Sequence, residues 1–197
     1  MYKTADNFLT LFNPDKQYDY CANLQRCYMG KAPTLRALNE AFGKNITETW
    51  LAIQIRNLSE FSGVKDKIDI TQVDELSKVI IATFHYLKVT ELMHFFLLFK
   101  SGRYGKFYGA VDGLAITEAL QDFCKERKER ISRFYQDEHR RKAEAEQERH
   151  EREVTRFYAL LDEYGISPFD WVKNQDLFKG GLAPEQIKAE LKSRLNK

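Results

Sequence analysis

The sequence predicts an all-α protein: a compact N-terminal helical bundle over residues 1–130, a long charged helix over 131–165, and a C-terminal docking segment with a short helix over 166–197. Two observations support this prediction. Apolar residues in the first half of the 197-residue chain recur every three or four positions, which is the period of an amphipathic helix and not of a strand. From Leu114 to Tyr164 there is neither glycine nor proline, so one helix can run through that whole stretch.

The first two well-marked helices each follow a capping residue and end at a glycine. Thr34 is the expected cap of the first, and Gly43 stands where a left-handed residue would end it. Either Asn45 or Thr47 caps the second, which Gly63 closes. The second helix has one strongly apolar face, formed by Trp50, Leu51, Ile53, Ile55, Leu58 and Phe61.

The next two helices lead to the centre of the bundle. Either Asp69 or Thr71 starts one of them, and its apolar residues again recur at helical spacing. Thr90 starts the other, in which the run from Phe95 to Phe99 leaves almost no polar side. Because a helix that is apolar all round is normally central, we expect this helix in the middle of the bundle.

The long helix has apolar ends and a charged middle. Between Gln136 and Glu153 no large aliphatic residue occurs, so the stretch lacks the apolar seam of a coiled coil and is expected to be a solvated spacer. Opposite charges four residues apart support an exposed helix there. The pairs are Asp137 with Arg141, Glu138 with Lys142, and Glu148 with Arg152.

The C-terminal segment carries its own start signals. Ser167 and Pro168 open a turn, and Ala183 with Pro184 marks the start of a short final helix. A helix this short is marginal alone, so we expect it to dock either on the apolar stripe over 157–164 or on a partner protein. The candidate partner-binding residues are Phe169, Trp171, Ile187 and Leu191.

Charge, cysteine content and the lengths of the apolar segments limit the partners and the compartment of this protein. The 31 basic and 29 acidic side chains leave a net charge of +2, so a nucleic-acid partner would need a local basic patch. Cys21, Cys27 and Cys124 form an odd set that indicates free thiols in a reducing compartment. The first 17 residues lack the apolar core of a signal peptide, and Phe95–Phe99 is far shorter than the roughly 20 residues that span a bilayer, so we predict a cytoplasmic protein without a membrane partner.

The segment from Lys100 to Gly109 combines three cations, three aromatic rings and three glycines, with no acidic residue between Glu91 and Asp112. Glycine lets backbone approach a ligand closely, arginine and tyrosine stack on bases, and lysine neutralises phosphate, so single-stranded nucleic acid is a suitable ligand. The candidate residues are Lys100, Arg103, Tyr104, Lys106 and Tyr108. The same composition also suits a structural corner whose tyrosines pack on the core, and both interpretations stay open.

No pattern in the sequence indicates catalysis, a cofactor or a metal. Gly105-Lys106 is followed by phenylalanine, whereas a phosphate-binding P-loop needs serine or threonine there. The four histidines lack the spacing of metal ligands, and His85 and His94 are expected to be hydrogen-bonded core residues. We therefore predict a non-enzymatic protein without cofactor or metal.

The segment from Glu91 to Arg130, centred on Phe99-Lys100-Ser101-Gly102-Arg103-Tyr104-Gly105-Lys106-Phe107-Tyr108-Gly109, resembles a helical family of uncharacterised proteins from Bacteroides-type gut bacteria and their mobile elements. The resemblance implies no known activity. The order of bundle, charged helix and docking segment is also similar in layout to phage replication accessory factors such as helicase loaders, an analogy that assigns no residue a role.

Two functions are consistent with these features. The first is an accessory protein in DNA replication or mobile-element biology that binds single-stranded nucleic acid through the segment from Lys100 to Gly109, the basic aromatic loop. The second is a protein-interaction adaptor without nucleic-acid affinity, in which the loop is a structural corner and the C-terminal segment recruits the partner.

Overall fold

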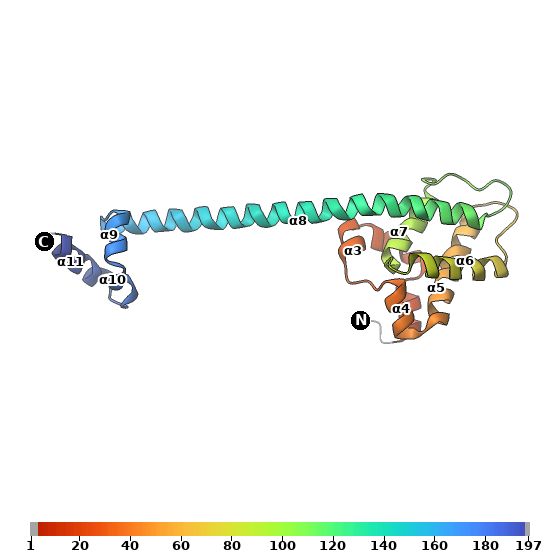
Figure 1. Ribbon diagram of the computed structural model, residues 1–197, viewed down its shortest axis with the longest axis horizontal. Helices are drawn as coiled ribbons and strands as arrows, with labels where there is room; N and C mark the ends of the chain where they lie inside the picture. The colour runs from red at the N-terminus through yellow and green to blue at the C-terminus, as the bar shows by residue number, and fades with distance from the viewer. Residues whose placement is uncertain (1–3, 196–197) are drawn as a thin grey trace. The chain divides into compact units, whose positions relative to one another are not determined.

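The computed structural model describes residues 4–195, and its regular structure is helical throughout (Figure 1). No strand occurs within that range, which confirms the all-α prediction. The elements in chain order are α1 (Ala5–Leu11), the short 3₁₀-helix η1 (Pro14–Lys16), α2 (Gln17–Cys21), α3 (Leu24–Met29), α4 (Leu35–Phe42), α5 (Lys44–Phe61), α6 (Ile70–Phe84), α7 (Val89–Lys100), α8 (Gly113–Tyr164), α9 (Pro168–Lys173), α10 (Gln175–Lys179) and α11 (Pro184–Leu195).

The chain divides into two compact units, Met1–Gln136 and Asp137–Lys197. Helix α8 contributes residues to both, and its unbroken course from Gly113 to Tyr164 confirms the long helix that the sequence predicts. Along the described part of the chain, no helix combines the length and the apolar character needed to cross a membrane.

Helix starts agree with the predicted ones at two of four places. Thr34 Oγ1 accepts a hydrogen bond from the backbone N–H of Ala37 at 3.1 Å, and Asp69 forms a capping box with Gln72. The other two predictions were wrong, because α5 begins at Lys44 directly after Gly43 and α7 begins at Val89 after Lys88, one residue before Thr90. Gly43 has a φ of 84°, so a single residue turns the chain from α4 into α5 and no further cap is needed.

Helix α7 lies in the middle of the first unit, as its apolar sequence predicts. It contacts α2, α3 and α5, and the side chains of Phe95 and Phe96 are fully buried. The ring of Phe95 also lies 5.7 Å from the ring of Phe123 on α8, measured between centroids. The first part of α8 is therefore held to the bundle through its apolar face.

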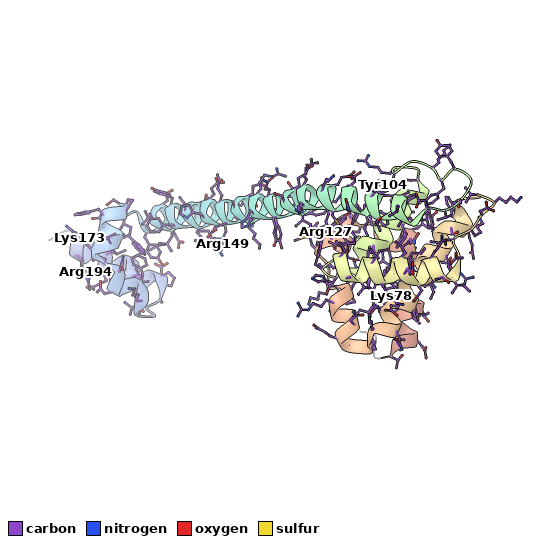
Figure 2. The ribbon with its side chains drawn as sticks, turned by 45° about the vertical axis from the view of Figure 1, so that its right-hand side comes forward. Lys78, Tyr104, Arg127, Arg149, Lys173 and Arg194 are labelled. Carbon is purple, nitrogen blue, oxygen red and sulfur yellow. The ribbon has the colours of Figure 1, made fainter. Side chains whose placement is uncertain are left out.

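The charged stretch of α8 is exposed along residues 141–156. Two predicted pairs are present, with 2.7 Å between Lys142 and Glu138 and 2.9 Å between Arg152 and Glu148. Asp137 instead pairs with Arg140, one position before the expected Arg141. Figure 2 shows side chains such as Arg149 projecting outward from this part of the helix.

The second unit has a small apolar core of its own. Helix α11 packs on the end of α8 and on α10, so it takes the first of its two expected docking sites, the stripe over 157–164. The Arg194 guanidinium pairs with Asp176 at 3.1 Å and ties α11 to α10. The core residues are Leu161, Ile166, Leu177, Ile187 and Leu191, surrounded by Phe157, Tyr164, Trp171 and Phe178.

Candidate functional site

The basic aromatic loop leaves α7 through a tight turn. The amide of Gly102 donates to the carbonyl of Phe99 at 3.0 Å, and the amide of Arg103 donates to the carbonyl of Leu98 at 3.1 Å. Gly102 has a φ of 82°, a left-handed conformation in which a side chain would be strained. After this turn, Arg103 is exposed and Tyr104 is half-buried.

Two of the five candidate residues point into the first unit. The Lys100 ammonium donates to Gln17 Oε1 at 2.8 Å and to Asn57 Oδ1, and burial lowers the pKa of Lys100. The ring of Tyr104, labelled in Figure 2, packs 5.6 Å from the ring of Phe95. These two placements match the structural-corner interpretation of the loop.

The hydroxyl of Tyr104 is buried, and no hydrogen-bond partner for it occurs within residues 4–195. Burial raises the pKa of Tyr104, so the phenol stays neutral at physiological pH. Its ring also lies 5.8 Å from that of Phe99. Tyr104 therefore acts as a packing residue at the base of the loop.

The other three candidates point outward. Arg103 pairs with Glu126 of α8 at 3.0 Å, and this hydrogen bond raises the pKa of the guanidinium. Lys106 is exposed and has no ion-pair partner in the described chain. Tyr108 is 90% exposed. Arg103, Lys106 and Tyr108 are thus exposed on the loop, whereas Tyr104 packs into the core and Lys100 is half-buried.

A second loop lies beside the first one. Asp66 and Ala110 form an isolated parallel bridge, in which the Asp66 amide donates to the Gly109 carbonyl at 3.3 Å and the Val111 amide donates to the Asp66 carbonyl at 3.2 Å. The α5–α6 loop thereby places the exposed Lys65 next to the basic aromatic loop. The sequence contains no local signal for this pairing, because it joins residues more than forty positions apart.

Sequence reasoning also missed a buried ion pair between α7 and α8. Glu91 is fully buried, and its Oε1 accepts from Arg127 Nε at 2.9 Å while its Oε2 accepts from the Lys88 amide at 2.9 Å. Burial raises the pKa of Glu91, and the Lys88 amide and the Arg127 guanidinium oppose that shift. A glutamate in the first turn of an otherwise apolar helix was the available signal.

The two central histidines differ. His94 is buried, as predicted, and its Nδ1 lies 2.8 Å from the Tyr28 hydroxyl. The prediction for His85 was wrong, because this residue caps the C-terminal end of α6 and is exposed. No cluster of three or more potential metal ligands occurs in the region 4–195.

The candidate partner-binding residues of the second unit fall into two groups. Ile187 and Leu191 are buried in the core of their own unit, and Trp171 packs against Phe157 with 5.0 Å between ring centroids. Phe169 is 66% exposed, with the Lys173 ammonium 4.3 Å from its ring centroid. Of the four, only Phe169 presents most of its side chain to solvent.

One family of proteins matches the chain. It is described as a family of unknown function, DUF6633, and it matches residues 67–165, half of the chain. The chain belongs to the DUF6633 family. The matched range covers α6, α7, the basic aromatic loop and all of α8, so in this chain it contains both Glu91 and Arg127. No curated protein and no solved structure matches the chain.

Proposed function

We propose that this DUF6633 protein is a non-enzymatic binding protein that holds single-stranded nucleic acid against the α7–α8 loop. The observation that carries the proposal is the ring of Tyr108, which is 90% exposed on the same loop as the exposed cations Arg103 and Lys106. An exposed ring on a loop that also carries exposed cations suits a base stacked on tyrosine with its phosphates on the basic side chains.

The buried polar groups support the non-enzymatic part of the proposal. Tyr28 and His94 bond to each other in the core with 2% and 5% of their surfaces exposed, and burial lowers the pKa of His94 to about 4. Shifted pKa values often mark active sites, but a substrate would need access to these groups. The lowered pKa of His94 therefore follows from its burial in the core.

The biological setting is part of the same proposal. The layout that resembles replication accessory factors favours a role beside nucleic acid in DNA replication or on a mobile element. The three cysteines are free thiols, which suits a reducing compartment such as the cytoplasm.

The test is fluorescence anisotropy of a labelled single-stranded oligonucleotide with the full chain over a salt series. Lys106→Ala/Tyr108→Ala should weaken binding about tenfold or more, because one stacked base is worth about 1–3 kcal/mol and one phosphate contact is also lost. The matched control Tyr18→Ala/Lys78→Ala removes one exposed tyrosine and one lysine from α2 and α6 and should bind like the parent protein. Absence of binding at low salt, or equal binding by both variants, would contradict the proposal.

A protein-interaction adaptor is the second candidate function. It is favoured by Phe169 and Val172 on α9, which are 66% and 60% exposed although both are apolar. Exposed apolar side chains close together in the chain suit a protein contact. This function predicts no nucleic-acid affinity, so the titration above separates it from the first.

A further inference from the structure

A cavity of about 410 Å³ opens between the end of α5 and the basic aromatic loop. Its walls come from Phe61 and Ser62 on one side and from the segments 99–102 and 105–107 on the other. This volume falls in the range of about 300–1,000 Å³ that is typical of small-molecule sites. The cavity is separate from the outward-facing Arg103 and Tyr108, which do not line it.

The charge of the cavity is positive. Lys100 and Lys106 both line it, and no aspartate or glutamate does. Neither lysine forms an ion pair with any of the described residues. Lys100 uses two of its three N–H donors on Gln17 and Asn57, which leaves one donor free. Burial lowers the pKa of Lys100, and the charge of Asp15 opposes this without forming an ion pair, so an anionic ligand would compensate the lost hydration of the ammonium.

The cavity also offers flat apolar surfaces. The rings of Phe99 and Phe107 stack at 5.0 Å with 15° between their planes, and both line the cavity. Phe61 lies on the other wall, 58% exposed, with the Lys100 ammonium 5.7 Å from its ring centroid. Surfaces of this kind accept a planar ring by stacking.

Two glycines, Gly102 and Gly105, line the cavity. Gly102 and Gly105 have φ values of 82° and 87°, and a Cβ built at either position would meet no atom within 4 Å. Empty space beside glycine backbone lets a ligand approach the loop closely.

We propose that this cavity binds a phosphate monoester attached to a planar ring, as in a nucleoside monophosphate, with the phosphate between Lys100 and Lys106 and the ring beside Phe61. The ligand can be a free nucleotide or the phosphorylated end of a strand. The proposal shares Lys106 with the nucleic-acid interface but does not rest on it, because a free nucleotide would bind without any strand.

The test is isothermal titration of the full chain with AMP, with adenosine and inorganic phosphate as partial ligands. AMP should bind at least about tenfold tighter than either part, since only AMP makes both the charge-assisted and the stacking contacts. Phe61→Ala and Lys106→Ala should each weaken AMP binding about tenfold, since each removes one of these contacts. Phe61 is mostly exposed, so its variant should fold normally, and circular dichroism checks this.

Tyr108→Ala separates the two proposals, since this residue belongs only to the nucleic-acid interface. AMP binding that survives Tyr108→Ala but not Phe61→Ala supports the cavity site whether or not the oligonucleotide binds. Tighter binding of a 5′-phosphorylated oligonucleotide than of its unphosphorylated form, with displacement by AMP, would identify a strand end as the source. Absence of saturable AMP binding at low salt, or AMP binding unchanged in Phe61→Ala and Lys106→Ala, would overturn the proposal.

Discussion

Arg127 Nε donates a hydrogen bond to Glu91 Oε1 over 2.9 Å, and this ion pair joins the central helix α7 to α8 inside the first unit. Glu91 is fully buried and the Arg127 side chain is 19% exposed. The guanidinium also lies over the ring of Tyr86, with 5.6 Å to the centroid. A carboxylate in this position depends on its partners for every interaction that water would otherwise supply.

Arg127→Ala should therefore destabilise the protein by about 3–5 kcal/mol, because it leaves a buried carboxylate with only the Lys88 amide as partner. Urea unfolding followed by circular dichroism measures the change. Arg133→Ala is the control, since Arg133 lies on the same helix and pairs with Glu129 at 3.7 Å between two exposed side chains. That control should cost about 0–1 kcal/mol. Equal losses in the two variants would show that the Glu91 pair does not stabilise the unit.

Stability should fall between pH 6.5 and pH 4 because of His94. Burial is the main cause that lowers the pKa of His94 from 6.5 to about 4, the charge of Arg130 acts in the same direction, and Glu126 opposes them. The unfolded state therefore binds more protons in this window. Above pH 6.5 His94 is neutral in both states and does not reduce the free energy of unfolding. As the pH falls from 6.5 to 4, His94 lowers the free energy of unfolding by roughly 3 kcal/mol.

The measurement is the free energy of unfolding against pH for the parent protein and for His94→Gln, which has no group that titrates there. The difference between the two proteins should change across this window. His85→Gln, at an exposed histidine, should follow the parent protein at every pH. Parallel curves for the parent and His94→Gln would refute the assignment.

Leu191→Ala should selectively loosen the second unit. Leu191 is 1% exposed in a core formed, among the described residues, by five buried side chains, and a leucine-to-alanine change in a core costs about 2–5 kcal/mol. Amide hydrogen exchange should show faster exchange in α9–α11 with unchanged protection in α5–α7, because the two groups of helices belong to different compact units. Lys192→Ala, on the same helix but exposed, should leave both patterns as they are. If amide exchange in α9–α11 is unchanged in Leu191→Ala, Leu191 does not stabilise the second unit as its burial predicts.

Asp69→Ala should remove the capping box at the start of α6. The Asp69 Oδ1 accepts from the Gln72 amide at 2.8 Å, and the Gln72 side chain accepts from the Asp69 amide at 3.2 Å. Loss of such a cap costs about 1 kcal/mol. Thermal unfolding of Asp69→Ala and Asp69→Ser measures it, since serine restores a capping oxygen. A serine variant that is as unstable as the alanine variant would assign the loss to another contact.

Some elements were predictable because their causes are local. The caps at Thr34 and Asp69, the unbroken α8 and two of three ion pairs along it each depend on residues no more than four apart. Gly43 shows where this reasoning is incomplete. The sequence predicts that Gly43 ends the first helix, but not that the next helix begins at the following residue without the cap expected at Asn45 or Thr47.

The candidate site shows the opposite case. The sequence brings three cations and three rings into one loop, but it does not say which of them face inward. Lys100 turns toward Gln17 and Asn57, 83 and 43 positions away in the chain, whereas Lys106 faces solvent. Contacts between residues so far apart in the chain cannot be recognised from the residues around Lys100.

The sequence by itself determined the all-α class, the continuous charged helix and the concentration of basic and aromatic residues after α7. Helix hydrogen bonds, caps and side-chain pairs act within about four residues, so the local sequence contains their causes. Only the tertiary structure decided the burial of Glu91 with Arg127, the pairing of the loops at Asp66 and Ala110, and the cavity between Phe61 and the basic loop. These features depend on which helix faces meet, and that is settled by the packing of the whole unit.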